Sequence, residues 1–347
     1  MTYKVFQWAS GGVGRQTGRV AAQRASLELV GLHVYSPQKA GMDAGELLGI
    51  EPIGIKATKD IQKVLDSDAD VVLHTPLASK VYGDNPDQDL DDICTLLAAG
   101  KNVITVVGYM YPKVYGDAVV DRLEQACRSG ASTFHSTGLN PGWLGDLIPL
   151  TMSALCERVD HVHILEASNF EHYPSPEIMF ESMGFNSEPD EFERSSARRT
   201  EWLNGLFSES VQMVADGMNL GVTEVVSTQQ LALAEEDLQT AAGTVRKGTV
   251  AGQHWRWAGL ANGEERIAHE TVWRMHSCVA PDWAVGNNTI TFKGAPSMHL
   301  EFESNFAFRS DGNLGTAMHA VNAIPYVVEA QPGIQTFLDL PWIMCRQ

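Results

Sequence analysis

Cysteine is scarce in this sequence, and the few cysteines present are scattered. The 347 residues include five, an odd number with no C-x-x-C pair, at Cys94, Cys127, Cys156, Cys278 and Cys345. A disulfide framework needs an even set, and a structural zinc site needs closely spaced ligands. We therefore expect free, reduced thiols and no metal.

Basic residues and long apolar runs are also scarce. Lysine and arginine number 25 against 43 aspartates and glutamates, a formal net charge of -18. Nucleic acids and anionic membranes both require a cationic surface, so we expect neither as a partner. No apolar run reaches the roughly 18 residues of a membrane helix. The N-terminal residues lack the basic and apolar regions of a signal peptide, which predicts a cytoplasmic protein.

The first 138 residues alternate between strand-like and helix-like segments. Apolar segments at 4–8, 27–35, 69–74, 102–107 and 132–136 are expected as strands. Segments at 14–24, 61–67, 87–99 and 114–130 are expected as helices. This alternation is typical of βαβ units around a parallel sheet. We predict an α/β protein whose residues 1–138 form a Rossmann-type, dinucleotide-binding domain.

A different pattern begins after residue 138. Helices are expected at 141–156, 176–185 and 195–218, and strands at 159–169, 223–232, 244–260, 264–276 and 297–308. Period-2 alternation in these strands predicts a mixed, largely antiparallel sheet. Residues 139–312 are therefore predicted to form an α+β substrate and dimerisation domain, with 186–199 as a mobile loop. A helix at 314–329 and the tail to 347 are expected to return to the first domain.

The sharpest local motif is a glycine-rich turn between the first strand and the first helix. It consists of Gly11, Gly12, Val13, Gly14 and Arg15, followed by Gly18 in the helix. The G-x-x-G spacing is found where the backbone approaches a pyrophosphate, and a helix N-terminus attracts phosphate. We expect these residues to bind a dinucleotide, with Gly18 allowing the helix to pack closely on the sheet.

The end of the second strand indicates which dinucleotide is preferred. An NAD site usually has Asp or Glu at this position, to bind the ribose hydroxyls. Here the strand ends in Tyr35 and Ser36, with Lys39 close behind. Ser36 and Lys39 suit a 2′-phosphate, which predicts NADP, with NAD possible; the alternative for Lys39 is a solvated turn.

Two further segments lie at the expected carboxyl edge of the parallel sheet. His74, Thr75 and Pro76 follow the third strand, where a loop passes beside the cofactor ribose or nicotinamide. The alternative is a simple turn ended by the proline. His135 closes the fifth strand and is either a catalytic or a core histidine.

Several motifs together resemble one enzyme family. They are the glycine-rich turn, the segments 34–47 and 332–341, and the run Thr137-Gly138-Leu139-Asn140-Pro141-Gly142. The chain resembles, over about residues 3–170 and 315–341, the dihydrodipicolinate-reductase-like proteins that include 2,4-diaminopentanoate dehydrogenase and the native amine dehydrogenases. The resemblance implies NAD(P)H-dependent hydride transfer to C=N or C=O of an apolar small molecule, by a homodimer. It also implies that Asn140 lies near the nicotinamide and Asn169 beside the substrate.

The sequence departs from this family after the fourth strand. The amine dehydrogenases carry a glutamate there, which would activate ammonia. Residues 105–112 of this chain contain no carboxylate, and valine and glycine cannot perform acid–base chemistry. Tyr109 and Tyr111 are the candidate proton donors in this segment, and aromatic packing is the alternative for each.

Candidates outside this segment carry less weight. Glu171 could supply a carboxylate, although a position at a solvent-exposed rim is the more ordinary interpretation. His161 and His163 alternate along one strand without a third ligand at suitable spacing, so no metal site is expected.

Three functions are consistent with these residues. The first is an NAD(P)H-dependent reductase of the amine-dehydrogenase-like family. The second is reduction of a C=C bond or a carbonyl without amine chemistry. The third is a non-catalytic NADP-binding sensor.

Overall fold

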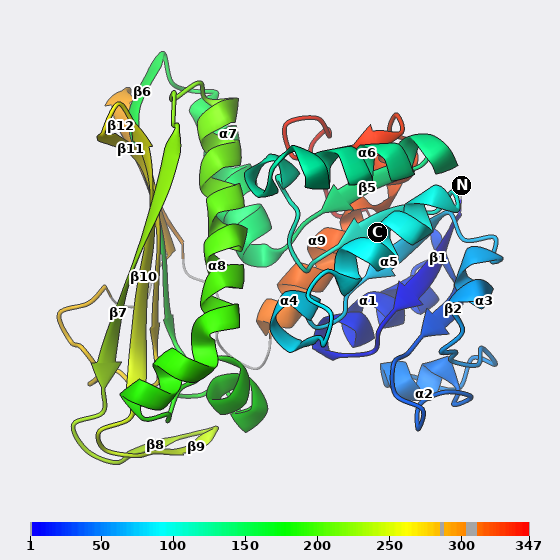
Figure 1. Cartoon of the computed structure of the whole chain (residues 1–347), viewed down its shortest axis with the longest axis horizontal. Coiled ribbons are helices and arrows are strands. Elements are labelled where there is room, and N and C mark those ends of the chain that lie inside the picture. The colour runs from blue at the N-terminus through cyan, green and yellow to red at the C-terminus, as the bar shows by residue number, and fades with distance from the viewer. Residues whose placement is uncertain (1, 285–287, 303–310, 347) are drawn as a thin grey trace. The chain divides into compact units, whose positions relative to one another are not determined.

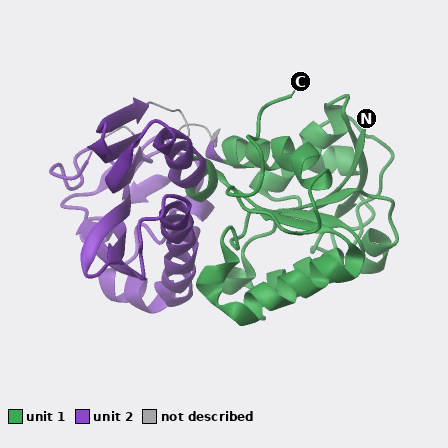
Figure 2. Cartoon of the chain, turned by 90° about the horizontal axis from the view of Figure 1, so that it is seen from above, with its two compact units in different colours: residues 1–143, 313–347 green, residues 144–312 purple. Residues whose placement is uncertain are grey.

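The computed structural model describes residues 2–284, 288–302 and 311–346. The chain forms two compact units, residues 1–143 with 313–347 and residues 144–312 (Figure 2). No helix within the described ranges is long and apolar enough to cross a membrane.

Unit 1 is built on a parallel sheet of six strands in the order β14-β5-β4-β3-β1-β2. The strands are β1 (Tyr3–Trp8), β2 (Leu27–His33), β3 (Val71–His74), β4 (Asn102–Thr105), β5 (Thr133–Ser136) and β14 (Gly333–Ile334). From β1 the chain proceeds outward to β2 and then returns to β3 on the other side of β1. The strand order therefore reverses between β1 and β3, the position at which open α/β sheets bind ligands.

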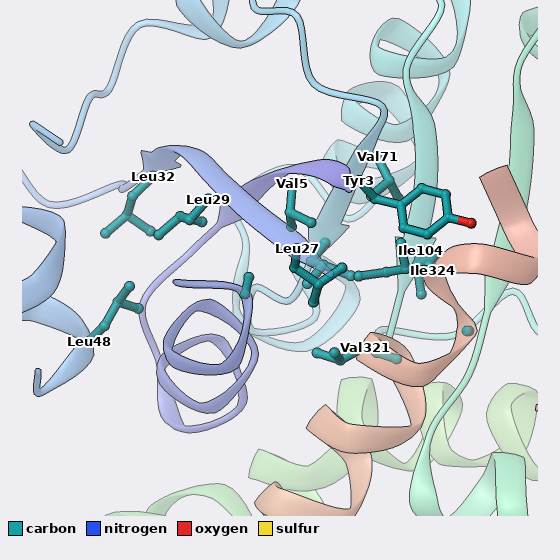
Figure 3. Packing of buried hydrophobic residues seen from close by; sticks show 14 of the residues in the cluster. Tyr3, Val5, Leu27, Leu29, Leu32, Leu48, Val71, Ile104, Val321 and Ile324 are labelled. Carbon is teal, nitrogen blue, oxygen red and sulfur yellow. The ribbon is translucent and has the colours of Figure 1, made fainter. Parts of the chain in front are cut away.

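Helices cover both faces of this sheet. They are α1 (Gly12–Gln23), α2 (Ala44–Leu48), α3 (Ile61–Leu65), α4 (Ser79–Tyr82), α5 (Gln88–Ala98), α6 (Asp117–Gly130) and α9 (Asp311–Val328), with a short 3-10 turn at Pro112–Tyr115. Val321 and Ile324 of α9 pack with Val5, Val71 and Ile104 of the strands (Figure 3). A second core on the other face joins the sheet to α5 and α6. The C-terminal helix is thus an integral part of unit 1.

Unit 2 contains a mixed sheet in the order β13-β12-β6-β11-β10-β7. Its strands are β6 (Arg158–Asn169), β7 (Glu224–Leu233), β10 (Val250–Ala261), β11 (Glu264–Arg274), β12 (Asn288–Ala295) and β13 (Met298–Phe302), with a small hairpin of β8 (Leu238–Thr240) and β9 (Gly243–Val245). Only the β6–β11 pair is parallel among the described pairs. The long helix α8 (Pro189–Gly217) packs along one face (Figure 1), where Phe207 stacks on Trp257 at 4.0 Å. The predicted fold class is confirmed.

Some predicted boundaries were wrong. The supposed loop 186–199 lies mostly in α8, which begins with Pro189 and buries Phe192. The expected helix 141–156 is regular only in α7 (Ile148–Ser153), because Asn140 and Pro141 are extended and Gly142 has φ 131°. The expected strand 244–260 is divided into β9 and β10 by a turn in which Gly248 has φ 82°. The expected helix 176–185 is observed as a π-helical turn over Glu177–Ser182.

Two strands of unit 2 also differ from the prediction. The expected strand 297–308 is observed as β13 as far as Phe302, and its remainder lies outside the described residues. The strand β12 was not predicted.

Candidate functional site

The glycine-rich turn lies at the carboxyl end of β1, beside the point where the strand order reverses. Ala9 has a φ of 72°, and α1 begins at Gly12 with Gly11 as its N-cap. Gly11 and Gly12 are exposed, and a Cβ added to Gly11 would meet nothing within 4 Å. The first turn of α1 therefore presents backbone N–H groups and the positive end of a helix dipole to an open surface, which suits phosphate.

Gly14 has a different role from the one its motif predicts. A Cβ at Gly14 would lie 2.4 Å from the Ala9 carbonyl oxygen and 2.9 Å from the Thr75 hydroxyl. Protein atoms therefore occupy the position that a Cβ of residue 14 would take, and a pyrophosphate would not lie there. A Cβ at Gly18 would lie 2.6 Å from a Leu48 methyl group and 3.2 Å from Gln7 Cγ, so Gly18 permits close packing as predicted.

A buried hydrogen-bond network fixes the shape of this turn. The Gln7 amide Nε2 donates to the carbonyls of Trp8 and Ala9, both at 3.0 Å, and to the Thr75 hydroxyl at 2.8 Å. Its Oε1 accepts from the Thr17 hydroxyl at 2.6 Å. Gln7 is fully buried. The sequence analysis missed this residue, although an amide within an apolar strand was a visible signal.

Two basic side chains near the glycine-rich turn, Lys39 and Arg15, extend in different directions. Lys39 follows β2, and its Nζ donates to Ser10 Oγ at 3.2 Å. Ser36 Oγ is turned instead to Gln38 Oε1 at 2.7 Å. Arg15 is exposed, and a Cβ at Gly49 would lie 2.8 Å from its guanidinium. The structure brings Lys39 to the glycine-rich turn, whereas Arg15 extends toward the end of α2.

The last residue of β3 and the residue after it support the turn through buried side chains. His74 is completely buried with Nδ1 2.9 Å from Thr105 Oγ1, and burial lowers its pKa to about 3. Thr75 is buried and donates to the Trp8 carbonyl at 3.0 Å. Pro76 is half-buried and Leu77 is exposed. Any ligand at this position would therefore meet Pro76, Leu77 and the backbone, and not the His74 ring.

The two candidate tyrosines after β4 differ in their surroundings. Both are buried, with 3% of each residue exposed. Tyr109 belongs to the core on the α5–α6 face and packs against Tyr115, with ring centroids 5.2 Å apart. The Tyr111 hydroxyl accepts a hydrogen bond from Lys113 Nζ at 3.1 Å. A cation at the Tyr111 hydroxyl would stabilise negative charge left by proton donation. Lys80 Nζ lies 5.3 Å from the centroid of the Tyr109 ring, so both tyrosines stay candidate donors.

Two histidines lie beside the carboxyl end of β5. His135 is fully buried, its Nδ1 is 2.7 Å from the Gln335 carbonyl oxygen, and burial lowers its pKa to about 4. This neutral, internal ring fits the core alternative. His319 of α9 was not anticipated; its Nδ1 contacts Thr137 Oγ1 at 2.8 Å and the Gly138 carbonyl oxygen at 3.1 Å. Burial also lowers the pKa of His319 to about 4.

The tautomer of His319 follows from these partners. A carbonyl oxygen can only accept, so Nδ1 carries the proton and pins the turn that leads to Asn140. Nε2 of His319 is buried and has no hydrogen-bond partner within the described part of the chain. Asn313, also near the start of α9, lies against the glycine-rich turn, because a Cβ at Gly12 would be 2.8 Å from its Nδ2. The C-terminal helix α9 therefore contacts both the glycine-rich turn and the turn that leads to Asn140.

The remaining candidates lie in unit 2. Asn169 ends β6, is half-buried, and accepts from the Glu171 backbone N–H at 3.0 Å. His161 and His163 pair separately with Glu265 at 2.8 Å and Glu270 at 3.5 Å. No group of three or more histidine, cysteine or acidic residues in the described ranges could hold a metal.

A parallel α/β unit with a glycine-rich helix start at its switch point is typical of Rossmann-type, dinucleotide-binding domains. Two protein-family models match this chain. The family described as 2,4-diaminopentanoate dehydrogenase C-terminal domain matches residues 143–346, more than half of the chain. Dihydrodipicolinate reductase, N-terminus, matches residues 8–82. The chain belongs to the 2,4-diaminopentanoate dehydrogenase family and is an NAD(P)-dependent oxidoreductase.

Individual relatives agree with this assignment. An amine dehydrogenase of Streptomyces virginiae is 28% identical, covering 96% of this chain and 95% of its own. The 2,4-diaminopentanoate dehydrogenase of Acetoanaerobium sticklandii is 24% identical over 72% of this chain and 69% of its own. The solved amine dehydrogenase of Mycobacterium smegmatis has a TM-score of 0.78 at 21% identity, covering 99% of this chain and 97% of that one. This last likeness supports the fold.

Proposed function

We propose that the chain is an NADP(H)-dependent reductase that transfers hydride to the C=N or C=O carbon of an apolar small molecule. The cofactor supplies the hydride. The observation that carries the choice of NADP is the position of Lys39, whose Nζ is 3.2 Å from Ser10 Oγ in the glycine-rich turn. Because the second strand ends in Tyr35 and Ser36, this cation has no adjacent strand-end carboxylate to repel a 2′-phosphate.

The names of the relatives support a carbon–nitrogen centre as the hydride partner. Apolar side chains near Asn169 support an apolar substrate. Phe170 and Trp273 are partly buried at the ends of neighbouring strands, against a cluster that includes Tyr173 and Met179. Asn169 supplies the polar group expected to orient such a molecule.

A second candidate activity follows from the residues that replace the family glutamate. Residues 105–112 contain no carboxylate, and the Tyr111–Lys113 pair favours proton donation over the uptake of free ammonia. A phenol has an ordinary pKa of about 10 and is a poor base toward ammonium. Reduction of a plain carbonyl or a C=C bond is therefore the second candidate.

We further infer a homodimer and a cytoplasmic location. Residues alternate across β10 and β11, so Trp257 and His269 face α8 while Arg256 and Glu270 lie on the opposite face. Arg256 Nε donates to Glu270 at 2.6 Å, and this polar face is where we place a second copy. The cysteines are free, which supports a reducing compartment.

The proposal is tested by following NADPH and NADH oxidation with a panel of apolar ketones, aldehydes, preformed imines and enones, each with and without ammonia. NADPH-dependent turnover of a ketone that requires ammonia supports amine formation. Turnover without ammonia supports the second candidate. Tight NADPH binding with no turnover of any compound would contradict both and favour a sensor.

A further inference from the structure

Two polar residues, Glu171 and His276, lie close together just beyond the ends of β6 and β11 in unit 2. These neighbouring strands are parallel, and their last paired residues are Asn169 and Arg274. The Phe170 N–H donates to the Arg274 carbonyl at 2.7 Å, so the two segments stay hydrogen-bonded beyond the last paired residues. Glu171 and His276 follow, and Glu171 Oε1 lies 3.4 Å from His276 Nε2.

The other nitrogen of His276 faces a thiol. Nδ1 lies 3.0 Å from Cys278 Sγ and accepts from the Cys278 backbone N–H at 3.2 Å. A neutral imidazole whose Nδ1 accepts carries its proton on Nε2, which is directed at the Glu171 carboxylate. The Nδ1 lone pair therefore faces both the backbone N–H and the thiol of Cys278, and the thiol is the nearer of the two.

This arrangement contains the three parts of an activated nucleophile. Cys278 is the nucleophile, His276 is the base, and Glu171 orients the base. Cys278 is exposed, while the side chains of His276 and Glu171 are 28% and 26% exposed. The groups do not converge on a metal position, because Glu171 and Cys278 occupy opposite nitrogens of the ring.

The other four cysteines have different surroundings, and Cys156 is half-buried with its Sγ 3.9 Å from the Pro296 carbonyl oxygen. Cys127 is buried, which raises the pKa of its thiol to about 12, and burial also raises the pKa of the Cys94 thiol. Cys345 is exposed like Cys278 but has no histidine partner within the described part of the chain. Cys345 is therefore an internal reference for an accessible, unassisted thiol.

We propose that Cys278 is a modification site for soft carbon electrophiles of the α,β-unsaturated carbonyl class. The thiolate sulfur bonds to the β-carbon as the C=C π bond breaks, and the thiol proton passes to His276 Nδ1. That proton is then returned to the α-carbon of the resulting enolate. The reaction is an addition that needs no oxidant and leaves no second product, and it is independent of the proposed reductase activity.

The test is competitive labelling of the full-length protein with a limiting amount of N-ethylmaleimide, followed by peptide mass spectrometry. Cys278 is expected to react about tenfold faster than Cys345, because His276 Nδ1, 3.0 Å from the sulfur, can take the thiol proton as the carbon–sulfur bond forms. In concentrated urea the two rates should become similar. Equal rates in the folded protein would overturn the proposal.

Two substitutions separate base assistance from loop structure. Asparagine at position 276 can accept the Cys278 N–H as His276 does, but it cannot take a proton. His276→Asn should therefore reduce the Cys278 rate to that of Cys345, and Glu171→Gln should reduce it in part. A His276→Asn variant that kept the wild-type labelling rate would contradict the role of the base. Circular dichroism confirms that each variant is folded.

Discussion

Single glycines in the cofactor turn are expected to have separable effects. Gly14→Ala would place a methyl group 2.4 Å from the Ala9 carbonyl oxygen and should lower the free energy of unfolding by about 1–3 kcal/mol. Gly11→Ala meets open space and should change it by less than about 0.5 kcal/mol. Urea denaturation of both variants measures this difference. Equal destabilisation would mean that the turn is not packed as described.

A second prediction at the level of single residues concerns the tyrosine hydroxyl that donates the proton. Tyr111→Phe removes a hydroxyl that is 3.1 Å from Lys113 Nζ and should lower kcat by roughly 10²-fold, with NADPH affinity unchanged. Tyr109→Phe, within the core, is the matched control and should have a smaller effect on kcat. Unchanged kcat in both variants would exclude the tyrosines as donors.

Sequence reasoning succeeded at this scale where the signal was local. The glycine-rich turn and Lys39 were predicted from contiguous residues and the end of one strand. The Gly14 contact and the role of His319 depend on partners such as Thr75 and Thr137 that are distant in sequence, so no local pattern contained them. The roles of all these residues in binding and catalysis stay predictions.

At the scale of elements, α8 shows why a polar segment misled the prediction. Its first turn contains Asp190 and Glu191 after Pro189 at the first helical position. Acidic residues and proline favour a helix N-terminus, but the same composition also resembles a loop. Only the burial of Phe192 and Ser196 shows that the segment packs.

The C-terminal helix supplies a further prediction. His319→Leu removes the donor to the turn at Gly138 and should weaken NADPH binding about tenfold, the cost of one buried hydrogen bond. Binding of 2′,5′-ADP, which lacks the nicotinamide, should not change. His319→Asn retains a donor and should lie closer to wild type. Equal weakening of both ligands, measured by calorimetry, would contradict this positioning role.

At the scale of the whole molecule, buried histidines make stability depend on pH. Burial lowers the pKa of His135 and His319 to about 4 and of His74 and His269 to about 3, from an ordinary value of 6.5. The unfolded chain therefore takes up protons first on acidification. Stability is fully present above about pH 6.5 and is lost as the pH falls toward 4.

Each of these histidines should cost roughly 1–2 kcal/mol between pH 7 and pH 5. Burial raises the pKa of Asp92 to about 6 and also raises the pKa of Asp89, so these two groups act in the opposite direction but are outnumbered by the histidines. Urea unfolding at pH 7, 6 and 5 measures the sum. The decline should be smaller in His319→Asn, and a flat profile in the wild type would contradict the buried, neutral rings.

The parallel sheet was predictable from apolar strands that alternate with helices, and the mixed sheet was predictable from period-2 alternation within its strands. The order of the strands was not predictable, since it arises from pairings such as β14 with β5, two hundred residues apart in the chain. The assignment of dinucleotide binding to unit 1, and of substrate binding and dimerisation to unit 2, stays a prediction.

The proposed selection of NADP by Lys39 is tested by titrating both cofactors into one variant. Lys39→Ala should weaken NADP⁺ binding by about 1–2 kcal/mol, the loss of a charge-assisted contact, and leave NAD⁺ nearly unchanged. Lys56→Ala, which removes an exposed lysine elsewhere in unit 1, should change neither affinity. Equal loss of NADP⁺ and NAD⁺ affinity in Lys39→Ala would contradict the account.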